Sequence, residues 1–253
     1  MSSWTSARTW ASCASRWPHS LSNTAYADMT LGEMIERLRA ATHDLQQPYF
    51  WQDAQWAAWL TDAERQACVR GRLLREDSRA SVCRIALRQG THTYPLHPAA
   101  YEIIHAQIRP ASGEPRRLHV ASREWLDAEQ PGWRESDRPA WALIQDERTV
   151  RVAGRIADAD ALELECYRLP LAALEAPGDE PEIHEAHHEA LLNWALHKAF
   201  AVVDAETFDE ARSAKAEQEF TRYFGPLPES DLRRRTRHDV VQRSYPDFQW
   251  RGR

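Results

Sequence analysis

The chain has 253 residues, of which 43% are hydrophobic and 28% charged, a mixture that suits a folded domain and excludes a wholly disordered chain. It holds no run of about eighteen apolar residues that could form a membrane span. It has only 9 glycines, which argues against a glycine-rich phosphate-binding loop. The net charge of −6 combines two unlike parts: residues 29–225 carry 33 acidic and 23 basic side chains, whereas residues 226–253 carry 4 acidic and 7 basic ones. An acidic body lacks the concentrated positive face that nucleic-acid-binding domains present.

Residues 1–28 differ in character from the chain that follows. They lack the basic start, apolar centre and small-residue cleavage site of a secretory signal, and their apolar residues follow no clear period. Strong helix signals begin directly after Met29. We therefore expect Met29 to be the natural start, and residues 1–28 to be an upstream extension or a disordered arm.

A pair of helices is predicted over residues 30–76. Thr30 and Glu33 form a capping-box pattern, and apolar residues then recur at helical spacing. Pro48 breaks this first helix, and Asp53 can cap a second one that runs to about Arg75. Neither helix can bury its apolar face alone, so the two are expected to pack as a helical hairpin.

From residue 80 to residue 170 the period of the pattern changes to two, which predicts a β-rich insert. Alternation on both sides of a Gln89-Gly90 turn predicts a hairpin over residues 83–96, and a second hairpin is predicted over residues 141–152. The clearest half-buried strand covers residues 162–167, where apolar and acidic or aromatic side chains alternate strictly.

Helical periodicity returns over residues 183–224, after a proline-rich linker at residues 176–182. One helix is expected to end near Phe200, and the next to stop at Gly225-Pro226, which is a strong C-terminal signal. Residues 226–253 have no apolar period of their own, which predicts an extended arm.

These elements together predict an α+β fold. The N-terminal and C-terminal helix pairs are expected to form a helical bundle, with the β-rich insert to one side. The predicted organisation is an extension at residues 1–28, a domain at residues 29–225 and an extended C-terminal arm at residues 226–253.

The arm combines an arginine cluster with aromatic residues, the side chains that most often anchor protein interfaces. We predict that a partner protein contacts seven of them: Arg233, Arg234, Arg235, Arg237, Tyr245, Phe248 and Trp250.

One motif resembles a catalytic site. His184-Glu185-Ala186-His187-His188 satisfies H-E-x-x-H, the spacing with which zinc proteases place two imidazoles on one helical face. The motif stands at the start of a helix rather than in its middle, and acidic residues at a helix start are also explained by the helix dipole. A structural role is favoured, and a zinc-dependent hydrolase that uses His184, Glu185 and His188 is the alternative. No other enzyme motif is present, so the chain is predicted not to be an enzyme and to need no cofactor.

The cysteines give no sign of a disulfide framework or a zinc knuckle. Cys13, Cys68, Cys83 and Cys166 are far apart in the sequence and form no C-x-x-C pair. They are expected to be small core side chains in a protein made in a reducing cytoplasm.

Several stretches, taken in order, resemble the tailed-phage head-to-tail connector (adaptor) proteins. The resemblance covers about residues 29–245, and its motifs are packing patterns rather than catalytic signatures. They are residues 29–35 (MTLGEMI), 48–51 (PYFW), 59–65 (WLTDAER), 94–98 (YPLHP), 145–148 (QDER), 167–170 (YRLP) and 182–200.

The resemblance implies a virion structural protein of the portal and neck region, made in the host cytoplasm. Such adaptors form rings, commonly twelve-fold, under the portal and prolong the channel through which genomic DNA passes. The implied partners are the portal protein, neighbouring copies of the chain and a downstream tail or stopper protein, with DNA passing unbound and no membrane involved. The arm at residues 226–253 would reach the portal. Besides the hydrolase, a host-encoded helical interaction module is a further alternative.

Overall fold

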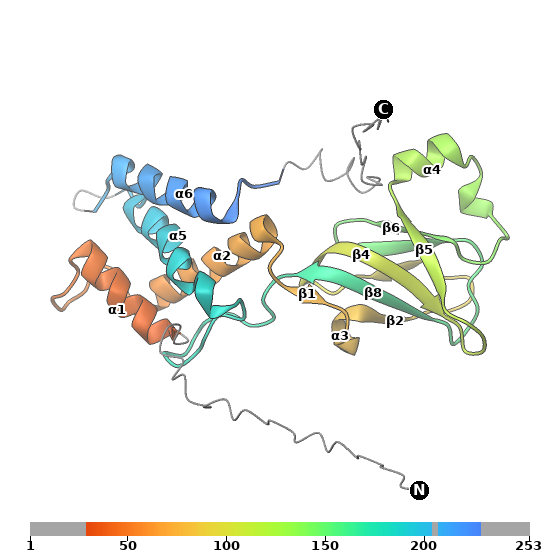
Figure 1. The fold of residues 1–253 in the computed structure, drawn as a ribbon, viewed down its shortest axis with the longest axis horizontal. Helices are drawn as coiled ribbons and strands as arrows, with labels where there is room; N and C mark the ends of the chain where they lie inside the picture. Colours follow the sequence, from red (N-terminus) through yellow and green to blue (C-terminus); the bar gives the residue numbers. More distant parts are fainter. Residues whose placement is uncertain (1–28, 204–206, 229–253) are drawn as a thin grey trace, which may run out of the picture.

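The computed structural model describes residues 29–203 and 207–228, and these form two parts that lie side by side (Figure 1). One part contains the long helices α1, α2, α5 and α6, and the other contains a β-sheet with its short helices. In the described chain, no helix is long and apolar enough to cross a membrane.

The N-terminal helices follow the sequence pattern closely. In α1 (Leu31–Thr42) the capping box is formed: the Thr30 N–H donates to Glu33 Oε2 at 3.1 Å, and the Glu33 N–H donates to Thr30 Oγ1 at 3.3 Å. Helix α2 (Asp53–Gly71) begins at the predicted residue but ends before Arg75. Arg72 takes a left-handed conformation with φ 52°, and the chain then enters a strand.

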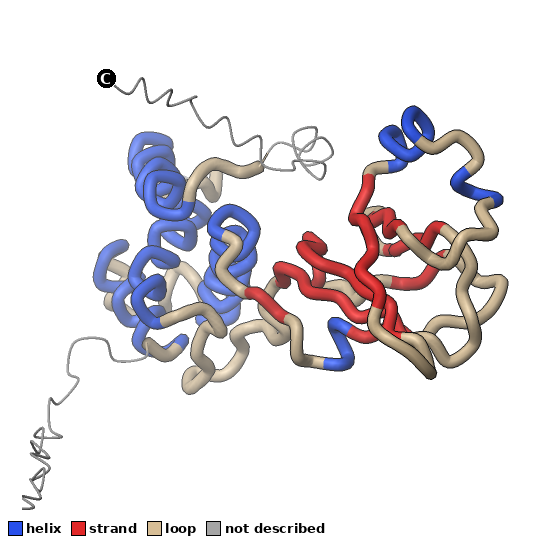
Figure 2. The backbone as a smooth tube through the Cα atoms, turned by 45° about the vertical axis from the view of Figure 1, so that its right-hand side comes forward, coloured by secondary structure: helices blue, strands red, loops and turns tan. Residues whose placement is uncertain are grey.

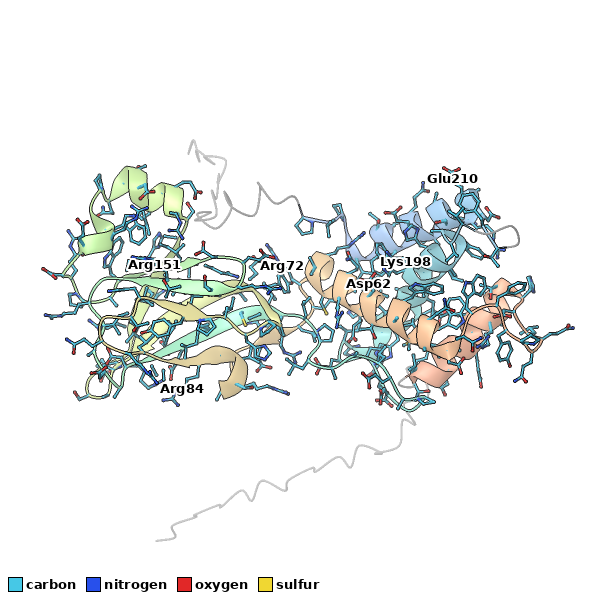
Figure 3. The ribbon with its side chains drawn as sticks, turned by 180° about the vertical axis from the view of Figure 1, so that it is seen from behind. Asp62, Arg72, Arg84, Arg151, Lys198 and Glu210 are labelled. Carbon is cyan, nitrogen blue, oxygen red and sulfur yellow. The ribbon has the colours of Figure 1, made fainter. Side chains whose placement is uncertain are left out.

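The C-terminal helices α5 (His188–Phe200) and α6 (Glu210–Phe224) pack on α1 and α2 around one apolar core. Trp56, Leu60 and Leu191 are fully enclosed in it. Polar contacts cross the packing surface of α2 and α5: the Trp194 indole N–H donates to Asp62 at 2.7 Å, and Lys198 lies 3.8 Å from the same carboxylate (Figure 3).

Within the described residues, eight strands form one curled mixed sheet (Figure 2). Its path is β1-β8-β4-β5-β6-β7-β3, with β2 paired to β8 beside β1. The strands in chain order are β1 (Arg75–Glu76), β2 (Arg84–Ala86), β3 (Thr93–Pro95), β4 (Ala100–Arg109), β5 (Arg116–Ala121), β6 (Ala142–Gln145), β7 (Thr149–Ala153) and β8 (Ala161–Arg168).

Short helices complete the sheet part. They are α3 (Ala80–Cys83), α4 (Arg123–Glu129) and the 3₁₀ turn η1 (Trp133–Glu135); a second 3₁₀ turn, η2 (Glu185–His187), precedes α5. The connection from β5 through α4 to β6 allows these two strands to run parallel, whereas the other paired strands are antiparallel. Trp133 and Leu126 from this connection cover a second, smaller apolar cluster on the sheet.

The predicted architecture of a helical bundle with a β-rich insert was wrong, although the general α+β class holds. The strands form a large curled sheet with its own core, separate from the core of the helices. The prediction failed because it treated residues 80–170 as local hairpins beside a bundle. The longest strands, β4 and β8, pair across more than fifty residues, and two irregularities in their register bend the sheet.

Of the strand predictions, those that depend on local pairing were confirmed, and the one that missed a long-range pairing was wrong. The hairpin over residues 141–152 is confirmed as β6 and β7, and the half-buried strand over residues 162–167 is confirmed as part of β8. The hairpin over residues 83–96 was wrong, since β2 pairs with β8 and β3 pairs with β7. Residues 80–83 are helical rather than extended.

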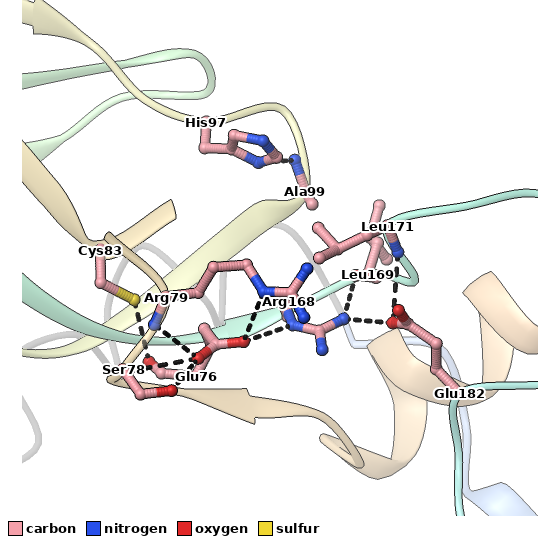
Figure 4. Close-up of polar contacts among 10 residues, drawn as sticks. All are labelled: Glu76, Ser78, Arg79, Cys83, His97, Ala99, Arg168, Leu169, Leu171 and Glu182. Atoms are coloured by element: carbon pink, nitrogen blue, oxygen red, sulfur yellow. Dashed lines mark hydrogen bonds and ion pairs between the residues drawn. The ribbon is translucent and has the colours of Figure 1, made fainter. Parts of the chain in front are cut away.

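A buried arginine joins the helices to the sheet (Figure 4). Arg168, at the end of β8, donates from Nε to Glu76 Oε2 at 3.2 Å and from Nη1 to Glu182, which precedes α5. Burial opposes ionisation of Glu76, but hydrogen bonds from Ser78, the Arg79 N–H and Arg168 prevail and lower its pKa to about 2. The chain passes from the helices to the sheet beside Glu76 and returns beside Arg168. The network therefore joins the two chain segments that connect the helices to the sheet.

Two further contacts fasten the same junction. Arg72, which lies where the helices meet the sheet (Figure 3), donates two hydrogen bonds to the Glu102 carboxylate, at 2.8 and 3.0 Å. The Tyr101 hydroxyl donates to the Cys68 carbonyl at 2.7 Å, which ties β4 to the end of α2. The two parts are therefore held in a defined relative position by paired charges and backbone contacts.

The segment predicted as a linker packs against the helices. The Leu31 N–H donates to the Asp179 carbonyl and the Gly32 N–H to the Pro177 carbonyl, both at 2.8 Å. These bonds satisfy N–H groups at the start of α1 that have no partner within the helix. Directly after this segment, the Ile183 N–H donates to the buried Glu64 of α2 at 3.2 Å.

The described cysteines Cys68, Cys83 and Cys166 are free and buried, as expected of small core side chains. Burial raises the pKa of the Cys68 and Cys166 thiols to about 12. These thiols are protonated at neutral pH and therefore poor nucleophiles.

We predict that Arg168→Leu destabilises the protein by about 3–5 kcal/mol, because it removes the buried cation shared by Glu76 and Glu182 and leaves Glu76 only the exposed Arg79, whose Nε lies 3.8 Å away. The stability that the ionised Glu76 provides is fully present above its ordinary pKa of 4.5 and is lost as pH falls towards 2. Urea unfolding at pH 7 measures the effect. The matched control is Arg117→Leu, on the exposed side of β5, and an equal loss in both variants would contradict the role of Arg168.

A second prediction concerns Glu64, which is 1% exposed. Burial raises its pKa from 4.5 to about 7, so the folded state holds a proton that the unfolded state releases. The free energy of unfolding should therefore fall as pH rises from 4.5 to 7, by about 3 kcal/mol, and then level off. In Glu64→Gln this fall should disappear. Unfolding curves that keep the same pH dependence in the variant would refute the assignment.

Candidate interaction surfaces

The H-E-x-x-H residues lie at the junction of η2 and α5. His184 caps η2, and its Nδ1 accepts the Ala186 N–H at 3.1 Å. Glu185 opens that 3₁₀ turn, whereas His188 is the first residue of α5. The motif therefore spans two helical segments and does not form the single helical face that a zinc protease requires.

His188 is a packing residue whose ring nitrogens are both engaged. It is 2% exposed, its Nδ1 accepts the Met29 N–H at 3.3 Å, and its Nε2 lies 2.9 Å from the Ile183 carbonyl. With this pair of partners, Nδ1 is the acceptor and Nε2 is the donor. Neither nitrogen is left to bind a metal ion.

The neighbouring histidine is also structural. His187 stacks edge-on against Tyr223 of α6, with ring centroids 5.8 Å apart. Burial and the neighbouring His184 and His188 lower its pKa. Within residues 29–203 and 207–228, no three His, Cys, Asp or Glu side chains are grouped so that they could hold a metal ion.

The seven predicted partner-binding residues belong to residues 229–253, which lie outside the described part of the chain. They are Arg233, Arg234, Arg235, Arg237, Tyr245, Phe248 and Trp250. Their role stays a prediction.

The sheet part carries a broad groove of about 980 Å³. Its walls come from the β3–β4 connection, the start of β4, the first turn of α4 and the β6–β7 turn. The lining residues are Pro95, Leu96, His97, Pro98, Ala100, Tyr101, Ser122, Arg123, Glu124, Ile144, Gln145, Asp146, Glu147, Arg148 and Pro228.

Polar contacts between side chains and backbone hold the walls of the groove together. The Gln145 side chain bridges to β4: its Oε1 accepts the Ile103 N–H at 3.0 Å and its Nε2 donates to the Tyr101 carbonyl at 2.9 Å. Arg123 and Asp146 form an ion pair at 3.0 Å across the groove wall. The YPLHP and QDER stretches also meet in space, since the Leu96 N–H donates to the Arg148 carbonyl at 2.9 Å, which their separation in the sequence did not indicate.

The described chain ends at this groove. After α6, the segment at residues 225–228 leaves the helices and points towards the sheet (Figure 1). Arg70 holds the start of this segment, since its Nη1 donates to Thr221 Oγ1 at 2.9 Å and to the Gly225 carbonyl at 3.5 Å. Pro228, the last described residue of the segment, is part of the groove lining and is half-buried.

A second surface lies at the end of the helices away from the sheet (Figure 1). Arg212 of α6 donates to the Ala41 carbonyl of α1 at 3.1 Å and thereby brings the α1–α2 and α5–α6 connections together. Both connections expose large apolar side chains: Leu45, Phe50, Val202, Val203 and Phe208. We call this surface the apolar tip.

Comparison with known protein families gives one informative match. The family model described as SU10 adaptor protein matches residues 29–243, which is most of the chain. No curated protein matches the sequence.

The hydrogen bonds of His188 generate a prediction. His188→Ala should lower the free energy of unfolding by about 1–3 kcal/mol, because the Met29 N–H and the Ile183 carbonyl lose their partner in a buried place. Thermal unfolding measures this loss, and atomic absorption measures zinc in the purified protein. Stoichiometric zinc that disappears in His188→Ala, but remains in the exposed control His119→Ala, would overturn the structural role.

Proposed function

The chain belongs to the SU10 adaptor protein family, and from this premise we propose that it forms a ring beneath the portal of a tailed phage and prolongs the DNA channel towards the tail. The match over residues 29–243 is the observation that supports this proposal. The family consists of phage structural adaptors, a class of virion component.

The charge distribution suits a channel wall. Residues 29–225 carry an excess of acidic side chains, and DNA carries a negative charge about every 1.7 Å along its axis. Coulomb repulsion at the wall lets the genome pass without sticking, whereas a basic wall would hold it. Genomic DNA is thus a passing neighbour rather than a bound ligand.

The firm junction between helices and sheet suits a ring subunit. A subunit repeated around a ring, commonly twelve times in such adaptors, must keep one shape so that successive contacts close the ring. The network around Arg168 provides this shape within each copy. Neighbouring copies, the portal above and a tail or stopper protein below are the proposed partners, and the neck of the virion is the proposed location.

The apolar tip supports contacts with other proteins. Val203 is 86% exposed and Leu45 65%, an exposure that costs free energy in an isolated protein and is recovered when a partner covers the surface. A zinc-dependent hydrolase is disfavoured, because both ring nitrogens of His188 contact backbone groups and neither is available to bind zinc. Membership of the family argues in the same way against a host interaction module.

For the arm, we predict that removing residues 226–253 leaves a folded body that no longer binds the portal. Its arginine and aromatic side chains are the anchors expected to be ordered on binding. Co-sedimentation of the purified protein with portal rings measures binding. Unchanged binding by the shortened chain would contradict the prediction.

A matched pair of variants separates the arm from net charge. One variant replaces the arm's cluster Arg233, Arg234, Arg235 and Arg237 with glutamine, and the control makes the same four changes at the exposed Arg84, Arg88, Arg117 and Arg138. The arm variant should lose portal binding and the control should keep it.

Electron microscopy tests assembly of the unmodified protein. The protein alone should show monomers, and the protein mixed with portal should show a ring.

A further inference from the structure

The groove on the sheet is wide enough for a peptide segment and lies where the described chain ends. Pro228 lines it, and 25 residues of the same chain follow Pro228. We propose that the groove binds the chain's own C-terminal segment, residues 229–253, in the isolated protein.

The path of the chain supports this occupant over others. Arg70 directs residues 225–228 from α6 towards the sheet, so the segment starts at the groove wall. A segment tethered at the edge of its site has an effective concentration in the millimolar range. A free peptide, or the same segment of a second copy, would have to compete against that concentration.

The groove lining has a small acidic excess, with Glu124, Asp146 and Glu147 against Arg123 and Arg148, and the segment has a basic excess. Glu124 and Glu147 are exposed at the groove, and neither has an ion-pair partner among the described residues, whereas Asp146 is already paired with Arg123. Residues 229–253 carry 7 arginines against 4 acidic residues. Carboxylates with free acceptor sites are the groups that guanidinium forks bind best.

The shape of the groove suits an extended chain with aromatic side chains. Pro95 and Pro98 give its rim rigid apolar rings, and the buried Leu96 and Ile144 lie beneath. Tyr245, Phe248 and Trp250 offer large apolar surface to such a site at a small cost in conformational entropy.

Docking has a consequence that rests on the proposed function. The same arginine and aromatic residues are the proposed portal anchors, so a groove that holds them keeps them from other partners until the portal competes for them. The isolated chain would then stay monomeric, and assembly would begin at the portal.

Chymotrypsin cleavage of the full chain tests the docking, because cleavage after Phe248 and Trp250 follows the fraction of segments that are released. A synthetic peptide of residues 229–253 gives the rate for an undocked segment. The wild-type chain should be cut at least about tenfold more slowly than the peptide, at any protein concentration.

The groove variant is Glu124→Arg with Glu147→Arg, and the matched control is Glu114→Arg with Glu129→Arg, which changes net charge equally at exposed sites outside the groove. The groove variant should be cut at nearly the rate of the peptide, and the control at the wild-type rate. Equal rates for wild type and peptide, equal rates for the two variants, or protection that disappears on dilution would each overturn the proposal. The last result would assign the segment to a second copy.

A second test changes only the C-terminal segment and leaves residues 29–225 as they are. In the variant with glutamine at residues 233, 234, 235 and 237, amide hydrogen exchange should rise at residues 95–101 and 144–148 relative to wild type. Unaltered exchange there would also overturn the proposal. Portal binding is measured separately, so failure of docking and failure of the proposed function remain distinguishable.

Discussion

The arrangement of this protein depends on one guanidinium group placed between two carboxylates. Arg168 lies at the end of β8 and contacts Glu76 at the start of the sheet and Glu182 before α5. Its side chain and that of Glu76 are almost completely buried, so an imperfect pairing would leave a charge without solvent. The geometry in which both carboxylates are satisfied is therefore strongly preferred over any in which the helices and the sheet separate.

This constraint decides where the surfaces of the molecule lie. With the helices and the sheet fixed, the end of α6 is directed towards the sheet, and Pro228 reaches the groove. The same constraint leaves the apolar tip at the opposite end of the helices. A subunit with a groove beside the junction of helices and sheet and an apolar surface at the far end of the helices can contact different neighbours without changing its shape.

One histidine of the H-E-x-x-H motif and a buried glutamate of α2 both serve the fold. His188 holds the Met29 N–H and the Ile183 carbonyl, and Glu64 receives the Ile183 N–H. These contacts hold the irregular segment before α5 against the helices. They give partners to the Met29 N–H and to the N–H and carbonyl of Ile183, which would otherwise be buried without any. For a protein whose family is structural, this use of histidine and glutamate is physically consistent: the groups stabilise a surface rather than act on a substrate.

The local elements of this protein follow from short stretches of its sequence. The capping box at Thr30, the stop at Gly225, the β6–β7 hairpin and the alternation of β8 all depend on neighbours within a few residues, and the ordered packing motifs were sufficient to indicate the adaptor family. The strand pairing is settled only in three dimensions, because the short strands β2 and β3 and the long strand β4 have several possible partners, and they pair with β8 or β7 more than fifty residues away. The Arg168 network and the groove were hidden for the same physical reason. Each is assembled from residues distant in the sequence, and a charge or a turn gives no sign of its partner until the chain has brought the two together.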